Sequence, residues 1–124
     1  MQTIEVRTFL NGRMQAVCER SYYGSAPASA TFPYIVWDMK ELSYEECFSL
    51  QEIEVDVVDY GSDTTAAESL ADDLQAALDH LSHLGDSFHI AVYRERRQTL
   101  SENDKSVIRR RLTFQVRLHE RSSL

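Results

Sequence analysis

The chain has 124 residues, 43% of them hydrophobic, and a formal net charge of -7 at pH 7. This length and apolar fraction favour one domain, residues 1–124, around a single modest core. The net negative charge argues against general nucleic-acid binding through phosphate neutralisation. No long apolar run and no signal-peptide pattern occurs, so we expect a soluble protein made in the cytoplasm, without a membrane span.

Charge is divided between two parts of the sequence. Twelve acids and no Lys or Arg occur from Glu41 to Asp79. Nine bases and only four acids occur from Arg94 to Arg121. One part of the chain is therefore electrostatically complementary to the other.

The segment from Thr3 to Val17 fits two patterns. Its apolar positions form one helical face, made of Val6, Phe9, Leu10, Met14 and Val17. Alternating apolar residues before Asn11-Gly12 instead resemble a strand entering a hairpin. We favour a helix that ends or bends at Gly12.

Two strands are predicted next. The first runs from Tyr34 to Met39, and Pro33 suits its entrance because proline cannot donate to a strand ladder. The second runs from Phe48 to Tyr60, where apolar and acidic residues alternate. This period of two predicts one buried face and one wet face carrying Glu52, Glu54 and Asp56.

An amphipathic helix is predicted from Thr65 to about Leu84, with Thr65 and Glu68 spaced as a capping box. A third strand begins with Phe88 to Val92, and a fourth runs from about Val107 to Leu118. Alternation places Arg110 on the core side of the fourth strand, where we expect a bulge or an edge.

The order helix, strand, strand, helix, strand, strand predicts an α+β fold. We expect a single, mostly antiparallel four-stranded sheet with two helices packed on it.

No pattern of catalytic residues is visible. His80 and His83 are three apart on the predicted helix, and the carboxylates of EIEVD lie on one strand face, so either set could hold a metal. A structural role is favoured for both, because imidazoles suit a helix C-terminus and strand carboxylates are usually solvated. Cys18 and Cys47 have no metal-binding spacing. We expect no enzyme activity, no metal and no cofactor.

The arginines of the third and fourth strands favour binding to phosphate or to protein carboxylates. Because acidic residues are plentiful elsewhere, one subunit's basic hairpin is predicted to dock on the acidic face of the next and close a ring. The predicted interface residues are Arg94, Arg96, Arg97, Arg109, Arg111, Glu52, Glu54, Asp56, Asp72 and Asp73.

Four stretches together resemble a known family. They are YYGSAPASATFPYIVWDM, VDVVDYGSD, ESLADDLQAALDHL and the terminal LTFQVRL, and they resemble the tail completion (tail terminator, or head-tail joining) proteins of long-tailed phages and prophages. The resemblance implies a small α/β subunit without enzyme activity, forming a hexameric ring in the virion. This ring would cap the tail tube, stop its polymerisation and contact the head connector.

Three alternatives remain open. One is a different phage neck or head-tail adaptor protein. Another is a small nucleic-acid-binding module that uses the basic C-terminal hairpin, touching DNA that passes through a ring. The third is a small metal-dependent enzyme that uses EIEVD or His80 and His83.

Overall fold

The computed structural model describes residues 2–120, and their side chains from Ile4 onward. Arg121, which belongs to the basic segment, lies outside the described residues. The elements in chain order are α1 (Gln2–Val17), β1 (Ser21–Tyr23), β2 (Tyr34–Glu45), β3 (Phe48–Tyr60), α2 (Thr65–Leu78), β4 (Ser82–Leu84), β5 (Phe88–Leu100) and β6 (Val107–Glu120).

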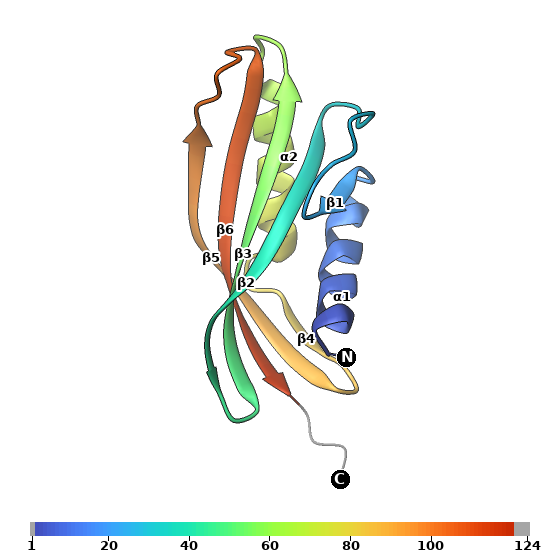
Figure 1. Cartoon of the computed structure of the whole chain (residues 1–124), viewed down its shortest axis with the longest axis vertical. Helices are drawn as coiled ribbons and strands as arrows, with labels where there is room; N and C mark the ends of the chain where they lie inside the picture. Colours follow the sequence, from blue (N-terminus) through green and yellow to red (C-terminus); the bar gives the residue numbers. More distant parts are fainter. Residues whose placement is uncertain (1, 121–124) are drawn as a thin grey trace.

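All six strands form one twisted sheet in the order β1-β2-β3-β6-β5-β4 (Figure 1). β1 pairs with β2 in parallel, and the other four pairs are antiparallel. The prediction of a mostly antiparallel four-stranded sheet is therefore wrong, because the sheet is mixed and has six strands. The two extra strands have three residues each, SYY and SHL, which is too short to show a period of two.

The two long hairpins extend further than the sequence pattern predicts. β2 continues from Met39 to Glu45 and turns through two residues, Glu46 and Cys47, into β3. Its outer part is exposed on both sides, so it lacks the apolar alternation that marks a half-buried strand. The connection between β5 and β6 lies at the end of the molecule opposite the β2–β3 turn (Figure 1).

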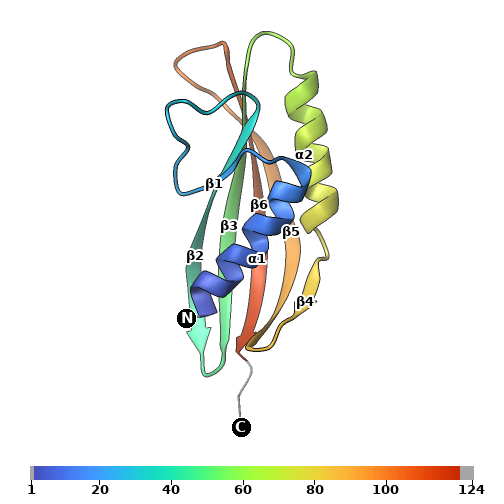
Figure 2. The same cartoon turned by 90° about the vertical axis from the view of Figure 1, so that its right-hand side faces the viewer.

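Both helices lie on the same side of the sheet (Figure 2). α1 is one continuous helix through Asn11 and Gly12, so the helical interpretation is confirmed and the expected end at Gly12 is wrong. Val6, Leu10 and Met14 are fully buried, each four residues after the last. That spacing places them on one helical face, and their burial against the sheet outweighs the local hairpin signal.

α2 buries Ala67, Leu70, Leu74 and Leu78 against the sheet, as its apolar stripe predicts. It ends at Leu78 and not near Leu84, because Asp79 is extended and His80 adopts φ 63°. Leu81 maintains the apolar spacing but packs against the core from the connection to β4. Periodicity alone therefore overestimates the length of this helix.

The N-terminus of α2 is stabilised by Asp63 and not by the predicted capping box. The Asp63 carboxylate accepts hydrogen bonds from the backbone N–H and the hydroxyl of Thr65, at 2.9 and 2.6 Å. These bonds, chiefly the one from the hydroxyl, lower the pKa of Asp63. Glu68 is turned toward arginines on β5 and β6, so it is not available to cap the helix.

A substitution at Leu74 tests the packing of α2 on the sheet. Leu74→Ala should lower the free energy of unfolding by about 2 to 5 kcal/mol, because a fully buried side chain is replaced by a cavity. Ala76→Ser, on the exposed face of the same helix, should cost less than about 1 kcal/mol. Urea denaturation followed by circular dichroism measures both, and equal losses would contradict this packing.

Candidate interaction surface

The face of the sheet opposite the helices carries a line of acids beside a line of bases. Asp56 on β3 pairs with Arg111 on β6 in the strand register. Its carboxylate accepts hydrogen bonds from Nε of Arg111 and Nε of Arg109, both at 2.8 Å, and from Nη2 of Arg111 at 3.0 Å. Asp56 is only 4% exposed, so the two guanidinium groups replace its lost hydration.

Neighbouring groups extend this ion-pair network. Glu54 lies 3.6 Å from Arg111, and Glu102 from the β5–β6 connection lies 3.3 Å from Arg109. The hydrogen bond that Arg111 donates to Asp56 raises the pKa of Arg111 above its usual value, with the charges of Asp56 and Glu54 adding to the effect. Arg109 and Arg111 of β6 are thus held by acids of their own chain.

A second ion-pair cluster links α2 to the hairpin on the helical side of the sheet. Arg97 donates to Asp72 at 2.6 Å and to Glu68 at 3.0 Å, and Arg110 also donates to Glu68. The bond to Asp72 raises the pKa of Arg97. Arg110 lies on the core side as predicted, but it is in regular register with Val57 and Thr99, so the expected bulge or edge is wrong. On the β5–β6 hairpin the register shift falls between Arg94 and Arg96.

Eight of the ten predicted interface residues form ion pairs inside the chain. They are Arg96, Arg97, Arg109, Arg111, Glu52, Glu54, Asp56 and Asp72. Arg94 and Asp73 form no ion pair with any other residue that the structure describes. The assignment of all ten to a subunit interface stays a prediction.

The residues considered for metal binding are engaged in other contacts. His83 stacks on Phe9 with ring centroids 3.9 Å apart, and His80 lies 3.3 Å from Asp79. They do not share a helix, because α2 ends before both. Each carboxylate of EIEVD lies beside a cation, with Glu52 3.5 Å from Lys40. Among the described residues, no group of three or more His, Cys, Asp or Glu could hold a metal ion.

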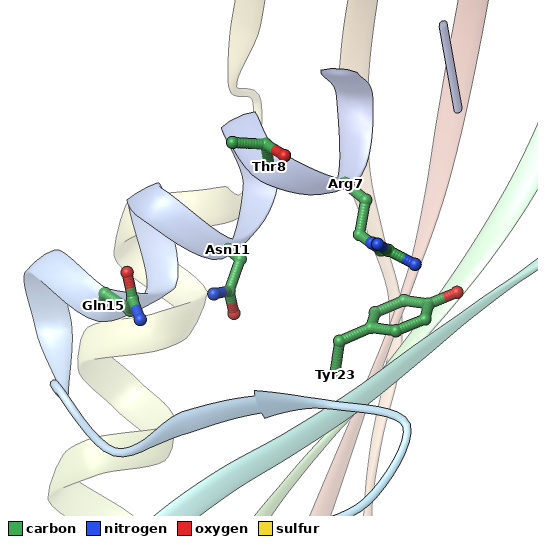
Figure 3. A pocket seen from close by; sticks show the side chains of 5 residues that line it. All are labelled: Arg7, Thr8, Asn11, Gln15 and Tyr23. Carbon is green, nitrogen blue, oxygen red and sulfur yellow. The ribbon is translucent and has the colours of Figure 1, made fainter. Parts of the chain in front are cut away.

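A polar pocket of about 470 Å³ lies between α1 and β1, lined by Arg7, Thr8, Asn11, Gln15 and Tyr23 (Figure 3). The Arg7 guanidinium lies 4.7 Å from the centroid of the Tyr23 ring. The Asn11 side-chain oxygen accepts hydrogen bonds from the Ser21 hydroxyl and the Trp37 indole N–H, both at 2.9 Å. Arg7 and Asn11 of this pocket thus attach α1 to the sheet. No two of the five lining side chains are arranged as a catalytic nucleophile and its base would be.

An exposed aromatic cluster marks one end of the sheet. Phe32 packs against Tyr34 and Tyr60, with ring centroids 5.5 and 5.7 Å apart, and Tyr22 contacts Tyr34. Phe32 and Tyr60 are about half exposed, at 47% and 54%. The sequence pattern does not predict this cluster, because Tyr60 is far from Phe32 along the chain and only the fold brings the two together. Exposed aromatic groups are typical of protein interfaces.

No helix in the described part of the chain is long and apolar enough to cross a membrane. The surface features are thus ion pairs, an open polar pocket and aromatic side chains.

Comparisons with known proteins find one family model and a solved chain of similar fold. A family model described as "Tail completion protein gp17" matches residues 2–119. A solved chain from the "Virion of native gene transfer agent (GTA) particle" has a similar fold, with a TM-score of 0.67 and 15% sequence identity. The similarity covers 86% of this chain and 84% of that one. Among curated proteins, none matches.

Asp56 tests the ion-pair network on the open face. Asp56→Asn removes the charge that two guanidinium groups bind, so it should lower the free energy of unfolding by about 2 to 4 kcal/mol. Glu54→Gln is the matched control, because Glu54 is more exposed and makes one long contact. It should cost less than about 1 kcal/mol. Thermal and urea unfolding compare the two, and similar stabilities would show that the Asp56 pairs contribute little.

Proposed function

The chain belongs to the tail completion protein gp17 family, and we propose that it ends the phage tail as a hexameric ring and joins the tail to the head connector. As a member of this family it is a structural protein of the phage virion tail. The observation that carries the proposal is the family match, which extends over nearly the whole chain. The proposed partners are further copies of this chain, the tail tube protein and the connector.

Features of the surface are compatible with an assembly role. The larger pockets are open and polar, whereas a small-molecule site is usually concave and mostly apolar. The aromatic cluster offers contact area for another protein. The solved chain of similar fold belongs to a gene transfer agent virion, and we propose a comparable place for this chain.

The nucleic-acid-binding alternative has less support. It needs arginines free to contact phosphate, yet Arg109 and Arg111 bind Asp56, and Arg97 binds α2. Contact with DNA inside a ring would therefore be passive under this proposal.

Inactivating the gene should produce tails that are longer than normal and lack heads, because nothing stops addition of tube subunits. Electron microscopy of lysates measures tail lengths and the fraction of tails joined to heads. Complementation with Ala76→Ser, a near-neutral substitution on the exposed face of α2, should restore normal length as well as the unaltered gene does. Tails of normal length on heads without this protein would contradict the proposal.

The copy number in completed tails tests the ring. Quantitative mass spectrometry of purified particles should find this chain at a constant number per tail, equal to a hexamer, whatever the tail length. The ratio of this chain to the major tube protein should therefore fall as the tails lengthen. A copy number that rises with tail length would identify a tube component and contradict a terminal ring.

A further inference from the structure

The sheet is covered along only part of each outer edge. On one side, β1 pairs with β2 from Ile35 to Trp37. On the other, β4 pairs with β5 from His89 to Ala91. Within residues 2–120, no strand pairs with the outer side of β2 beyond Trp37 or of β5 beyond Ala91. An edge strand presents backbone N–H and C=O groups that can pair with another chain.

Two aspartates mark where the coverage of each edge ends. The backbone N–H of Met39 on β2 donates to the Asp38 carboxylate at 2.9 Å. The backbone N–H of Arg94 on β5 donates to the Asp79 carboxylate at 2.8 Å. Beyond these points lie the open β2 edge, Met39 to Glu45, and the open β5 edge, Glu95 to Leu100. A register shift lies between Glu41 and Ser43 on β2, and another lies between Arg94 and Arg96 on β5. The regular part available for strand pairing is therefore Ser43 to Glu45 on β2 and Arg96 to Leu100 on β5.

The two open edges carry opposite charge. The open β2 edge holds two acids, Glu41 and Glu45, and one base, Lys40, which already lies beside Glu52; Asp38 and Glu46 flank this edge. The open β5 edge holds Arg96, Arg97 and one acid, Glu95, and Arg94 precedes it. Arg94 and Arg96 are exposed, Arg96 lies 3.1 Å from Glu95, and Arg97 is bound to α2. Like edges therefore repel each other and unlike edges attract.

Exposed apolar side chains lie on the open β2 edge and next to the open β5 edge. Leu42 and Tyr44 on the open β2 edge are 45% and 59% exposed. Tyr93, just before the open β5 edge, is 39% exposed. Pairing with a second strand would cover part of this surface, which favours association.

We infer that the open β2 edge of one subunit pairs with the open β5 edge of the next, and this inference rests on the proposed ring. The occupant of each edge is a second copy of this chain. Within one subunit β2 and β5 run in opposite directions, because three antiparallel pairings separate them. If neighbouring subunits are related by a rotation about an axis parallel to the strands, each strand keeps its direction from one subunit to the next. The β2–β5 pair between subunits would therefore be antiparallel.

The position of the open edges predicts how neighbouring sheets are arranged. The β2–β3 turn and the end of β5 lie at opposite ends of the molecule (Figure 1). In the register of the sheet, Asp38 aligns through Glu54 and Thr113 with Arg96. Pairing the open edges thus staggers one sheet against the next, as strands are staggered in a tilted, closed barrel. Unlike contacts of this kind close rings when the rotation allows it.

Photo-cross-linking within assembled tails tests the pairing directly. A benzophenone-bearing amino acid replaces Tyr44, in cells that assemble the particles, and tails are purified and irradiated. Cross-linked peptides should join position 44 to the open β5 edge of a second copy. The same group in place of Ala76, on the exposed face of α2, is the control and should not reach that edge.

Charge reversal provides the second measurement. Glu41→Arg with Glu45→Arg, and separately Arg94→Glu with Arg96→Glu, should each lower the amount of this protein per tail by about tenfold. The combination restores opposite signs and should recover most of the loss. Arg13→Glu, on the exposed face of α1, is the control for a charge reversal away from both edges, in the same direction as the Arg94→Glu and Arg96→Glu changes. Circular dichroism confirms that each variant is folded.

The outcomes separate this inference from the proposed function. Tails that contain the protein but cross-link position 44 elsewhere, or to no second copy, overturn the edge pairing alone. Folded single-edge variants that enter tails normally also overturn it, as does a combined variant that remains as poor as either one. Absence of the protein from tails overturns both proposals.

Discussion

The antiparallel pairing of β3 with β6 is the interaction on which the rest of the molecule depends. Every residue from Phe48 to Tyr60 has a partner on β6, and these strands occupy the middle of the sheet. On one face the register places Val55 beside Leu112 beneath the helices. On the other face it places Asp56 beside Arg111. A slip of one residue would exchange the faces and put carboxylates into the core, so burial and charge fix the same register.

The division of charge along the sequence is used first within the subunit. Acids of β3 and α2 lie beside bases of β5 and β6 because these segments, distant in sequence, become neighbours in the sheet. The buried position of Asp56 makes both arginines necessary, since a lone buried carboxylate is costly. What remains for contact with other molecules is the charge that the fold leaves unpaired. Some of that charge lies at the outer edges, with acids along β2 and Arg94 on β5.

The sequence predicted the elements with strong periods and missed those without them. The alternation in β3 and the apolar stripe of α2 identify their core faces correctly. The prediction that the other face of β3 is wet is wrong at Glu52 and Asp56, which are 9% and 4% exposed because cations of neighbouring strands cover them. β1 and β4 have too few residues to show a pattern, and their pairing depends on where α1 and α2 place the chain. Opposite charges predict that ion pairs form, but the partners follow from register, which is a tertiary property. Arg109 and Arg111 are an example: the register places Asp56 of the same chain beside them, and their part in a subunit interface stays a prediction.

A protein that stops a growing tube has to bind one layer without offering the next layer the same surface. Under the proposed function, the helical layer gives the two faces of the sheet different chemistry, one buried under α1 and α2 and one polar. The edges remain the places where identical subunits can meet through their backbones. Because β1 and β4 each cover part of an outer strand, only one segment of β2 and one of β5 remain open to pairing. Opposite charge then favours pairing of an open β2 edge with an open β5 edge over pairing of two like edges. Under the inferred pairing, each subunit has one partner on each edge, and assembly would end at a ring where the rotation between subunits closes.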